Sequence, residues 1–229
     1  VIVKQPTLLM LYLKALGKYY LNKDMTSADI GTNALTVGPT SDATKLYFTK
    51  LWGHDNNLMY FVNHSYPLMR KGWGATADYI LLEDGDEVDL AMFSDSNFYV
   101  NGAFAFFDKT KNTVSAGSKL KLKLMSTSTK AGFDGNSADA NAPMPGETIK
   151  VSKNYGKTWI KGLYGTDDTD KNGEFSAVFN KPGTYYISAG PYFAKQKASP
   201  FCIAPPVSVV HVRPYPVTGK KEEINAEGD

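Results

Sequence analysis

Residues 58–95 read LMYFVNHSYPLMRKGWGATADYILLEDGDEVDLAMFSD. This stretch contains three apolar runs with the length and composition of β-strands, at 58–62, 79–82 and 88–93. In the last run the apolar residues recur at every second position, which gives one apolar face. Asp84 and Gly85 stand between the second and third runs, and glycine accepts the positive φ of tight turns. The sequence therefore predicts a hairpin at this Asp-Gly step.

The composition limits the class of protein. The chain has 229 residues, 42% of them hydrophobic, which suits one or two domains with real cores. A net charge of +2 lacks the basic excess of nucleic-acid-binding domains, so no nucleic-acid partner is expected. The single cysteine, Cys202, excludes an internal disulfide and a cysteine-cluster metal site. No run of eighteen apolar residues is present, so we expect no membrane insertion.

The first half opens with an apolar segment, 6–21, that predicts a buried helix starting at Pro6 and ending at Gly17. A membrane-surface helix is the alternative, although the segment lacks a basic polar face. Two short strands are expected after it, at 34–37 and 46–51. A helix packed across a sheet gives an α+β fold for this half.

The second half has the pattern of an all-β module. Lys119, Lys121 and Lys123 alternate with leucines, so the strand has one basic and one apolar face. The basic face is either a solvated edge-protecting surface or a site for an anionic polymer such as teichoic acid. Further strands are expected at short spacing, at 148–151, 158–161, 174–179, 184–189 and 207–212. Short strands separated by glycine-containing turns predict a β-sandwich.

No constellation of catalytic or metal-binding residues stands out. Residues 168–173 match the start of a calcium loop, but position twelve of that loop is Phe179 where a glutamate is needed. We therefore interpret this segment as a hairpin turn. Asp84 and Asp86 could imitate the paired carboxylates of a polysaccharide hydrolase, but aspartate also favours tight turns. We expect no catalytic residues, no metal site and no cofactor.

The segment 63–77 is the best candidate for ligand binding, because it places aromatic and polar side chains in a connector without strand periodicity. The candidate residues are Asn63, His64, Tyr66, Arg70 and Trp73. The alternative is that Tyr66 and Trp73 cap the core of the sheet.

Two family resemblances add to this interpretation. Residues 58–63, 72–74 and 77–88 resemble the transcobalamin C-terminal-like family, whose members have a ubiquitin-like β-grasp fold and occur in bacterial surface proteins and in animal cobalamin carriers. The chain differs from that family's usual pattern at His64, where glycine is common.

The second half is similar to bacterial immunoglobulin-like surface repeats. The similarity lies in three segments, PGETIKV at 145–151, TDKNGEF at 169–175 and PGTYYISA at 182–189. It implies an immunoglobulin-like β-sandwich with a structural or adhesive role outside the cell.

Together these observations predict an α+β β-grasp domain at 1–101, an immunoglobulin-like all-β domain at 102–213, and a linker at 214–229. The boundary is expected between residues 94 and 109. The predicted function is a non-enzymatic, monomeric binding or adhesion module of a bacterial cell surface, cut from a longer secreted protein. Its partner would be a surface glycan, a host protein or a small ligand. The alternatives are a cobalamin-like ligand binder, a polysaccharide hydrolase and a module with a Lys–Asn isopeptide crosslink.

Overall fold

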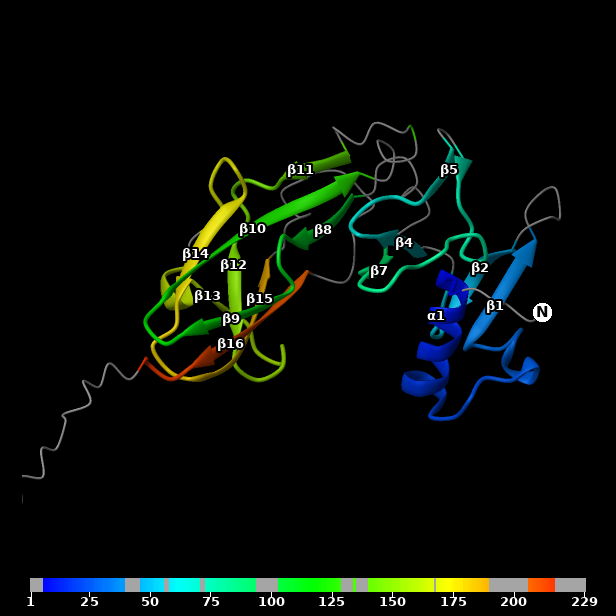
Figure 1. Ribbon diagram of the computed structural model, residues 1–229, viewed down its shortest axis with the longest axis horizontal. Coiled ribbons are helices and arrows are strands. Elements are labelled where there is room, and N and C mark those ends of the chain that lie inside the picture. Colours follow the sequence, from blue (N-terminus) through cyan, green and yellow to red (C-terminus); the bar gives the residue numbers. More distant parts are fainter. Residues whose placement is uncertain are drawn as a thin grey trace, which may run out of the picture.

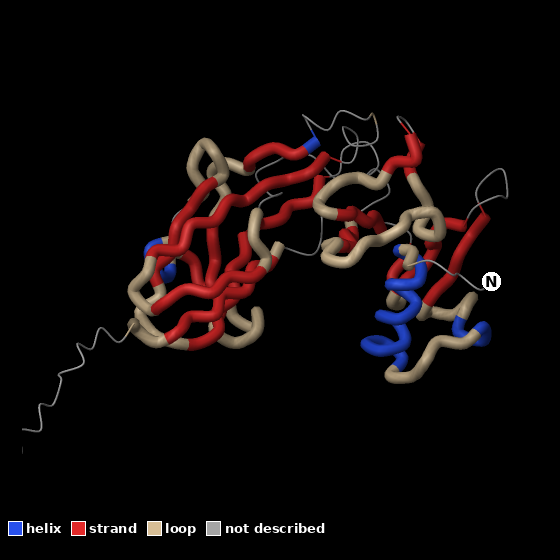
Figure 2. The backbone as a smooth tube through the Cα atoms, viewed as in Figure 1, coloured by secondary structure: helices blue, strands red, loops and turns tan. Residues whose placement is uncertain are grey.

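The computed structural model describes residues 6–39, 46–55, 58–70, 73–93, 103–128, 134, 140–166, 168–189 and 206–216. The fold is mostly β, with several small sheets and one α-helix in the first half (Figure 2). Within these described ranges no helix is long and apolar enough to cross a membrane. The Asn-Gly step at 101–102, which is a hairpin signal in the sequence, lies outside the described residues. So do Cys202 and the residues of the predicted linker after 216.

The predicted helix exists, but its ends differ from expectation. Helix α1 (Leu8–Ala15) begins after Thr7, whose side chain accepts a hydrogen bond from the Met10 N–H. Gly17 does not end it, because the chain continues as a π-helix, η1 (Leu16–Leu21). Gly17 has a packing role instead: a Cβ atom there would lie 2.7 Å from the carbonyl oxygen of Lys23. Glycine at this position lets the chain that leaves the helix return against it.

A three-stranded antiparallel sheet follows the helix in sequence, after a short 3-10 turn, η2 (Ser27–Asp29). Its strands are β1 (Leu35–Pro39), β2 (Leu46–Leu51) and β3 (His54–Asp55), so the two predicted strands are confirmed. The helix and this sheet share a core, because Leu8, Leu16, Leu35 and Leu51 are all buried in one cluster. We call this cluster the smaller core.

The predicted hairpin at Asp84-Gly85 is wrong. Residues 83–86 do form a turn, with the Asp86 N–H 3.2 Å from the Glu83 carbonyl oxygen. However, β7 (Val88–Met92) pairs antiparallel with β4 (Leu58–Val62) and not with 79–82.

The run at 79–82 is not a strand, because its backbone is used by the start of the helix. The Leu8 N–H donates to the Ile80 carbonyl, and the Leu82 N–H donates to the Pro6 carbonyl. With the backbone of 79–82 used in this way, β7 pairs with β4 instead.

The second half forms two sheets that face each other (Figure 1). In the first sheet β10 (Lys119–Ser128) pairs with β8 (Ala103–Phe107), β11 (Asn141–Pro143) and β14 (Glu174–Val178). The second sheet has the order β13 (Ile160–Lys161), β12 (Ile149–Ser152), β15 (Gly183–Ala189), β16 (Val207–Arg213), β9 (Lys111–Ser115). All six strands predicted for this half are confirmed, and the neighbouring pairs are antiparallel except β16 with β9.

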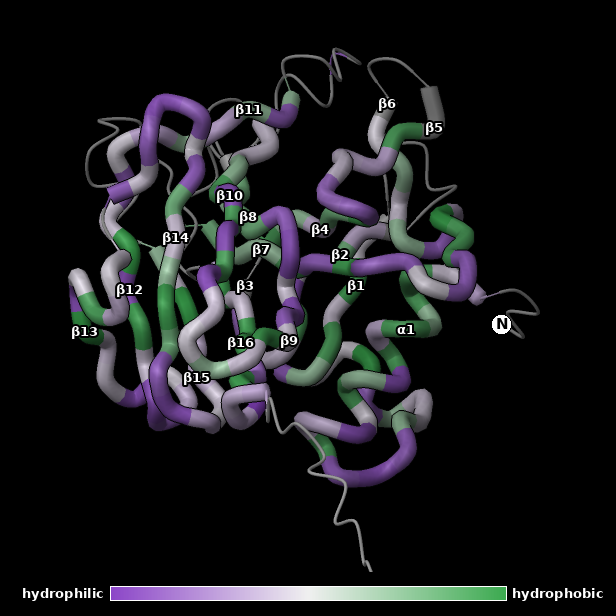
Figure 3. Tube along the Cα trace, turned by 60° about the vertical axis from the view of Figure 1, so that its left-hand side comes forward, coloured by the Kyte–Doolittle hydropathy of each residue, from purple (hydrophilic) through white to green (hydrophobic). Residues whose placement is uncertain are grey.

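The sandwich core has the side-chain alternation that the sequence predicts. Leu120, Leu122 and Leu124 are buried, whereas Lys119 and Lys121 of the same strand are exposed. Val151 and Ile187 face them from the second sheet and are fully buried. Apolar segments of β12 and β14, which belong to opposite sheets, stand out in green in Figure 3.

Strand β4 contributes to both cores. Met59 and Phe61 point into the larger core, which contains the sandwich residues, whereas Leu58 and Val62 pack against the smaller core. The Phe61 ring stacks on Phe104 of β8, with 5.1 Å between centroids and 14° between planes. Figure 1 shows β4 and β7 between the helix and the sandwich. The predicted division at 101/102 stays a prediction, since 94–102 lie outside the described residues.

Replacing Phe61 by alanine should lower the free energy of unfolding by about 3–5 kcal/mol, because a fully buried ring is removed from the interface of the two halves. Urea denaturation followed by tyrosine and tryptophan fluorescence measures this. Leu11→Ala is the control: Leu11 is 41% exposed on α1, and the expected change is below about 0.5 kcal/mol. A loss below about 1 kcal/mol for Phe61→Ala would contradict the shared-strand arrangement.

Candidate functional site

The predicted ligand-binding connector begins with a tight turn at Asn63 and His64. These two residues have φ values of 51° and 56°, and Val62 and Ser65 on either side exchange two hydrogen bonds of 3.0 Å. Two successive positive φ values are the signature of a type I′ turn, in which asparagine is favoured. The turn therefore ends β4 and starts the connector.

The Asn63 side chain ties this turn to the turn at 83–86. Its Nδ2 donates to Asp86 Oδ1 at 2.7 Å, and its Oδ1 accepts from the Glu87 N–H at 3.0 Å. The other carboxylate oxygen of Asp86 accepts from the Glu83 N–H at 2.7 Å. The Glu83 backbone hydrogen bond, followed by that of Asn63, lowers the pKa of Asp86 because both stabilise the charged carboxylate. Asp86 thus serves turn formation.

His64 lies at the junction of the two halves. Its Nδ1 is 3.0 Å from Asp89 Oδ2, and its Nε2 is 3.8 Å from Glu87 Oε2. Because a carboxylate only accepts, Nδ1 carries the proton and donates to Asp89. The imidazole also stacks on Phe106 of β8, with 4.0 Å between centroids and 12° between planes. These contacts surround the ring, so His64 connects the β4–β7 pair to the sandwich.

The remaining candidate residues lie further along the connector. Tyr66 is 8% exposed and belongs to the larger core, with its hydroxyl close to the backbone of Gly74. β5 (Leu68–Arg70) and β6 (Trp73–Gly74) form a small antiparallel pair in which Arg70 is opposite Trp73. The Arg70 and Trp73 side chains lie outside the described part. Asn63, His64 and Tyr66 therefore stabilise the fold at the junction of the two halves. Ligand binding by the five candidate residues stays a prediction.

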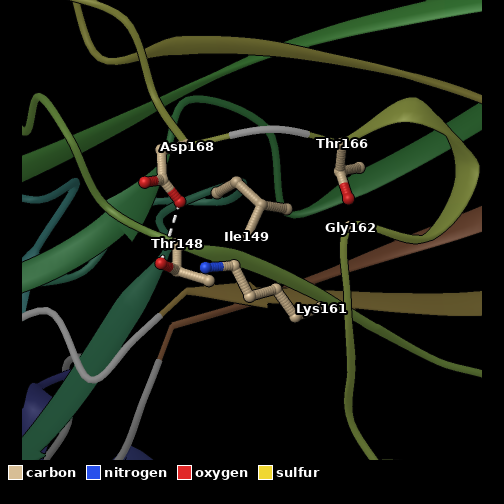
Figure 4. A pocket seen from close by; sticks show the side chains of 6 residues that line it. All are labelled: Thr148, Ile149, Lys161, Gly162, Thr166 and Asp168. Atoms are coloured by element: carbon tan, nitrogen blue, oxygen red, sulfur yellow. Dashed lines mark hydrogen bonds between the residues drawn. The ribbon is translucent and has the colours of Figure 1, made fainter.

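The sandwich contains a cavity that the sequence did not indicate. It has a volume of about 380 Å³ and is lined by Thr148, Ile149, Lys161, Gly162, Thr166 and Asp168. Thr148 and Ile149 lie where β12 begins, Lys161 ends β13, and Gly162, Thr166 and Asp168 belong to the segment around η3 (Leu163–Gly165). Figure 4 shows the Thr148 hydroxyl donating to Asp168 Oδ1, at 2.8 Å, and the Lys161 side chain extending toward Thr148.

The lining of this cavity suits hydrogen bonding to a small polar molecule. Lys161 provides a cation and three donors, and Asp168 provides a carboxylate acceptor. Among the described residues that line the cavity, Asp168 is the single carboxylate. Of the residues that line the cavity, only Asp168 stood out in the sequence, as the first position of the calcium-like loop.

The calcium-like segment forms a turn, as predicted, but the turn is not part of a hairpin, because β14, which follows it, pairs with β10. Asp170 Oδ1 accepts from the N–H groups of Asn172 and Glu174, both at 2.8 Å, and Gly173 has φ of 74°. This carboxylate is therefore used by the turn itself. Across the part of the chain that the structure describes, no group of three or more His, Cys, Asp or Glu side chains could hold a metal ion.

Comparisons with known proteins add little. No protein-family model and no curated protein matches the chain. The chain is similar to the crystal structure of Dscam1 isoform 9.44, N-terminal four Ig domains, with 10% identity over 81% of this chain and 42% of that chain. The TM-score is 0.24, an overlap too small to assign a fold or a function. The class of protein therefore rests on the structure alone, which is rich in β-sheet and has a two-sheet sandwich as its second half.

Replacing Asn63 by alanine should lower the free energy of unfolding by about 1–2 kcal/mol. The variant loses the hydrogen bond to the Glu87 N–H, and alanine adopts the left-handed backbone conformation of this position less readily than asparagine. Asn63→Gly is the matched variant, since it loses the same side chain but adopts positive φ without cost. We expect its unfolding midpoint in urea to lie between those of the wild type and Asn63→Ala. Equal losses in the two variants would contradict a contribution from the backbone conformation.

Proposed function

We propose that this chain is a non-enzymatic binding or adhesion module of a bacterial cell-surface protein, composed of a β-grasp unit and an immunoglobulin-like sandwich. The observation that supports it most is a hydrogen bond at the start of β15. The Tyr185 hydroxyl donates to the carbonyl oxygen of Lys181, four residues upstream, at 2.8 Å. In immunoglobulin-like domains a tyrosine at the start of strand F makes this kind of bond and fixes the corner before the strand.

The strand order agrees with this assignment. In the first sheet, β8, β10 and β14 correspond to the immunoglobulin strands A, B and E. In the second sheet, the neighbouring strands β9, β16, β15, β12 and β13 correspond, in that order, to A′, G, F, C and C′. Ile187, two residues after Tyr185, occupies the position of the strand F cysteine in antibody domains and is fully buried. Ile187 faces the first sheet. This position supports apolar packing as the link between the two sheets, at the place where antibody domains have a disulfide.

Support for the β-grasp unit comes from the packing of the helix. Helix α1 packs with β1 and β2 in the smaller core, in agreement with the resemblance to transcobalamin C-terminal-like domains. The described strand pairs of this half are antiparallel. Because members of both resembled families occur in surface proteins, we place the module outside the cell.

A binding role without catalysis is favoured by how the polar residues are used. His64, Asp86 and Asp170 each make hydrogen bonds that hold turns or the junction. Immunoglobulin-like sandwiches present loops at their ends, where binding residues are held by a rigid scaffold.

The assignment of Tyr185 is tested by Tyr185→Phe. Removing the hydroxyl leaves the Lys181 carbonyl without this donor, and the unfolding free energy should fall by about 1 kcal/mol. Tyr186→Phe is the matched control on the neighbouring, outward position of β15, with no expected change beyond about 0.5 kcal/mol. Equal stability of the wild type and Tyr185→Phe would remove the support that this bond gives.

The function is tested by presenting the whole chain to an array of polysaccharides and host extracellular-matrix proteins. We expect saturable binding to at least one class, and no release of reducing sugar from any bound polysaccharide. Release of reducing sugar would establish a hydrolase. A rise in melting temperature with hydroxocobalamin, without array binding, would favour the cobalamin-like alternative.

A further inference from the structure

Two tyrosines form an exposed aromatic surface on the sandwich. Tyr155 lies in the loop between β12 and β13 and is 79% exposed. Its ring centroid is 5.4 Å from that of Tyr186 on β15, with 45° between the planes. We propose that Tyr155 and Tyr186, here called the tyrosine platform, bind a pyranose ring of a glycan by stacking. This inference rests on the proposed function, because it names the ligand class of the binding module.

The loop that carries Tyr155 is rigidly held. Ser152 is 1% exposed, and its Oγ accepts from the N–H groups of Asn154 at 3.2 Å and Gly156 at 3.0 Å. The same hydroxyl donates to Asn154 Oδ1 at 2.9 Å. Asn154 Oδ1 also accepts from the Thr158 N–H at 2.9 Å. The ring of Tyr155 is thus presented on a fixed backbone, and the entropy lost on binding is reduced.

The backbone conformation of Tyr155 is unfavourable for its residue type. Its φ is 58°, a left-handed value that bulky residues rarely adopt and that asparagine or glycine adopts at lower cost. The following residue, Gly156, has φ of 78° and packs against Trp159, so glycine is placed where the turn needs it. A strained tyrosine that buries little of its own surface contributes little to folding, which indicates a role in recognition.

The size and chemistry of the platform favour a sugar ring over a protein surface. Two tyrosine side chains offer about 300–500 Å² together, less than the roughly 600 Å² that each partner contributes to the smallest stable protein interfaces. The surrounding residues Asn154, Lys157 and Thr158 are exposed and polar. An apolar ring face bounded by hydrogen-bonding groups matches a pyranose with equatorial hydroxyls, whose C–H groups form a flat face and whose hydroxyls lie at the edge.

The test uses affinity electrophoresis of the full chain in gels with hydroxyethylcellulose, glycol chitin or mannan, and calorimetry with cellohexaose and chitohexaose. Tyr155→Asn removes the ring and relieves the strain, so its melting temperature should equal or exceed that of the wild type. Its affinity should fall about tenfold, and that of Tyr186→Ala likewise. Tyr19→Ala, which removes a tyrosine that is 73% exposed in the other half, is the matched control and should bind as the wild type does.

The outcomes separate this inference from the proposed function. Equal affinity of the wild type and Tyr155→Asn for the same polysaccharide overturns the platform and leaves the binding function standing with its site elsewhere. The same holds if the wild type binds a matrix protein but none of the polysaccharides or hexasaccharides. If the wild type binds neither class, both the platform and the proposed function are rejected.

Discussion

The structure depends on one short strand that is apolar on both faces. In β4, Met59 and Phe61 alternate with Leu58, Tyr60 and Val62, and a β-strand places alternate side chains on opposite sides. Each side therefore packs against a different core. An ordinary surface strand would have one polar face and could not join two cores. Because Met59 and Phe61 are buried on one side and Leu58 and Val62 are partly buried on the other, the helix-containing half and the sandwich are coupled through this strand.

The same constraint explains why the most promising connector residues serve the fold. β4 ends at Asn63 and His64, so the turn that reverses the chain lies at the junction. Polar groups near such a junction need hydrogen-bond partners, and Asp86, Glu87 and Asp89 provide them. The recognition chemistry that remains lies on the sandwich, at the tyrosine platform, where the ring of Tyr155 is held by its loop and faces solvent.

Local sequence pattern predicted the sandwich well and the first half in part. The alternation in 119–124 and the glycine-containing turns located the strands, because period-two hydrophobicity specifies both a strand and its inner face. Gly17 and the run at 79–82 were misinterpreted for different reasons. The chain turns back on Gly17 at Lys23, only six residues further on, and this local return explains the glycine. The run at 79–82 meets a distant segment, because the backbone of 6–8 takes the hydrogen bonds of 80–82.

The sequence by itself determined six of the sandwich strands, which side of 119–124 faces the core, and that Asp170 and Gly173 make a turn. These are properties of residues within a few positions of one another, so short-range periodicity and turn chemistry are sufficient. Only the tertiary structure decided that β7 pairs with β4, that His64 stacks on Phe106, and that the loop after β12 places Tyr155 beside Tyr186 of β15. Such contacts join residues tens of positions apart, and they follow from which backbone edges and apolar faces remain unpaired once the local elements have formed.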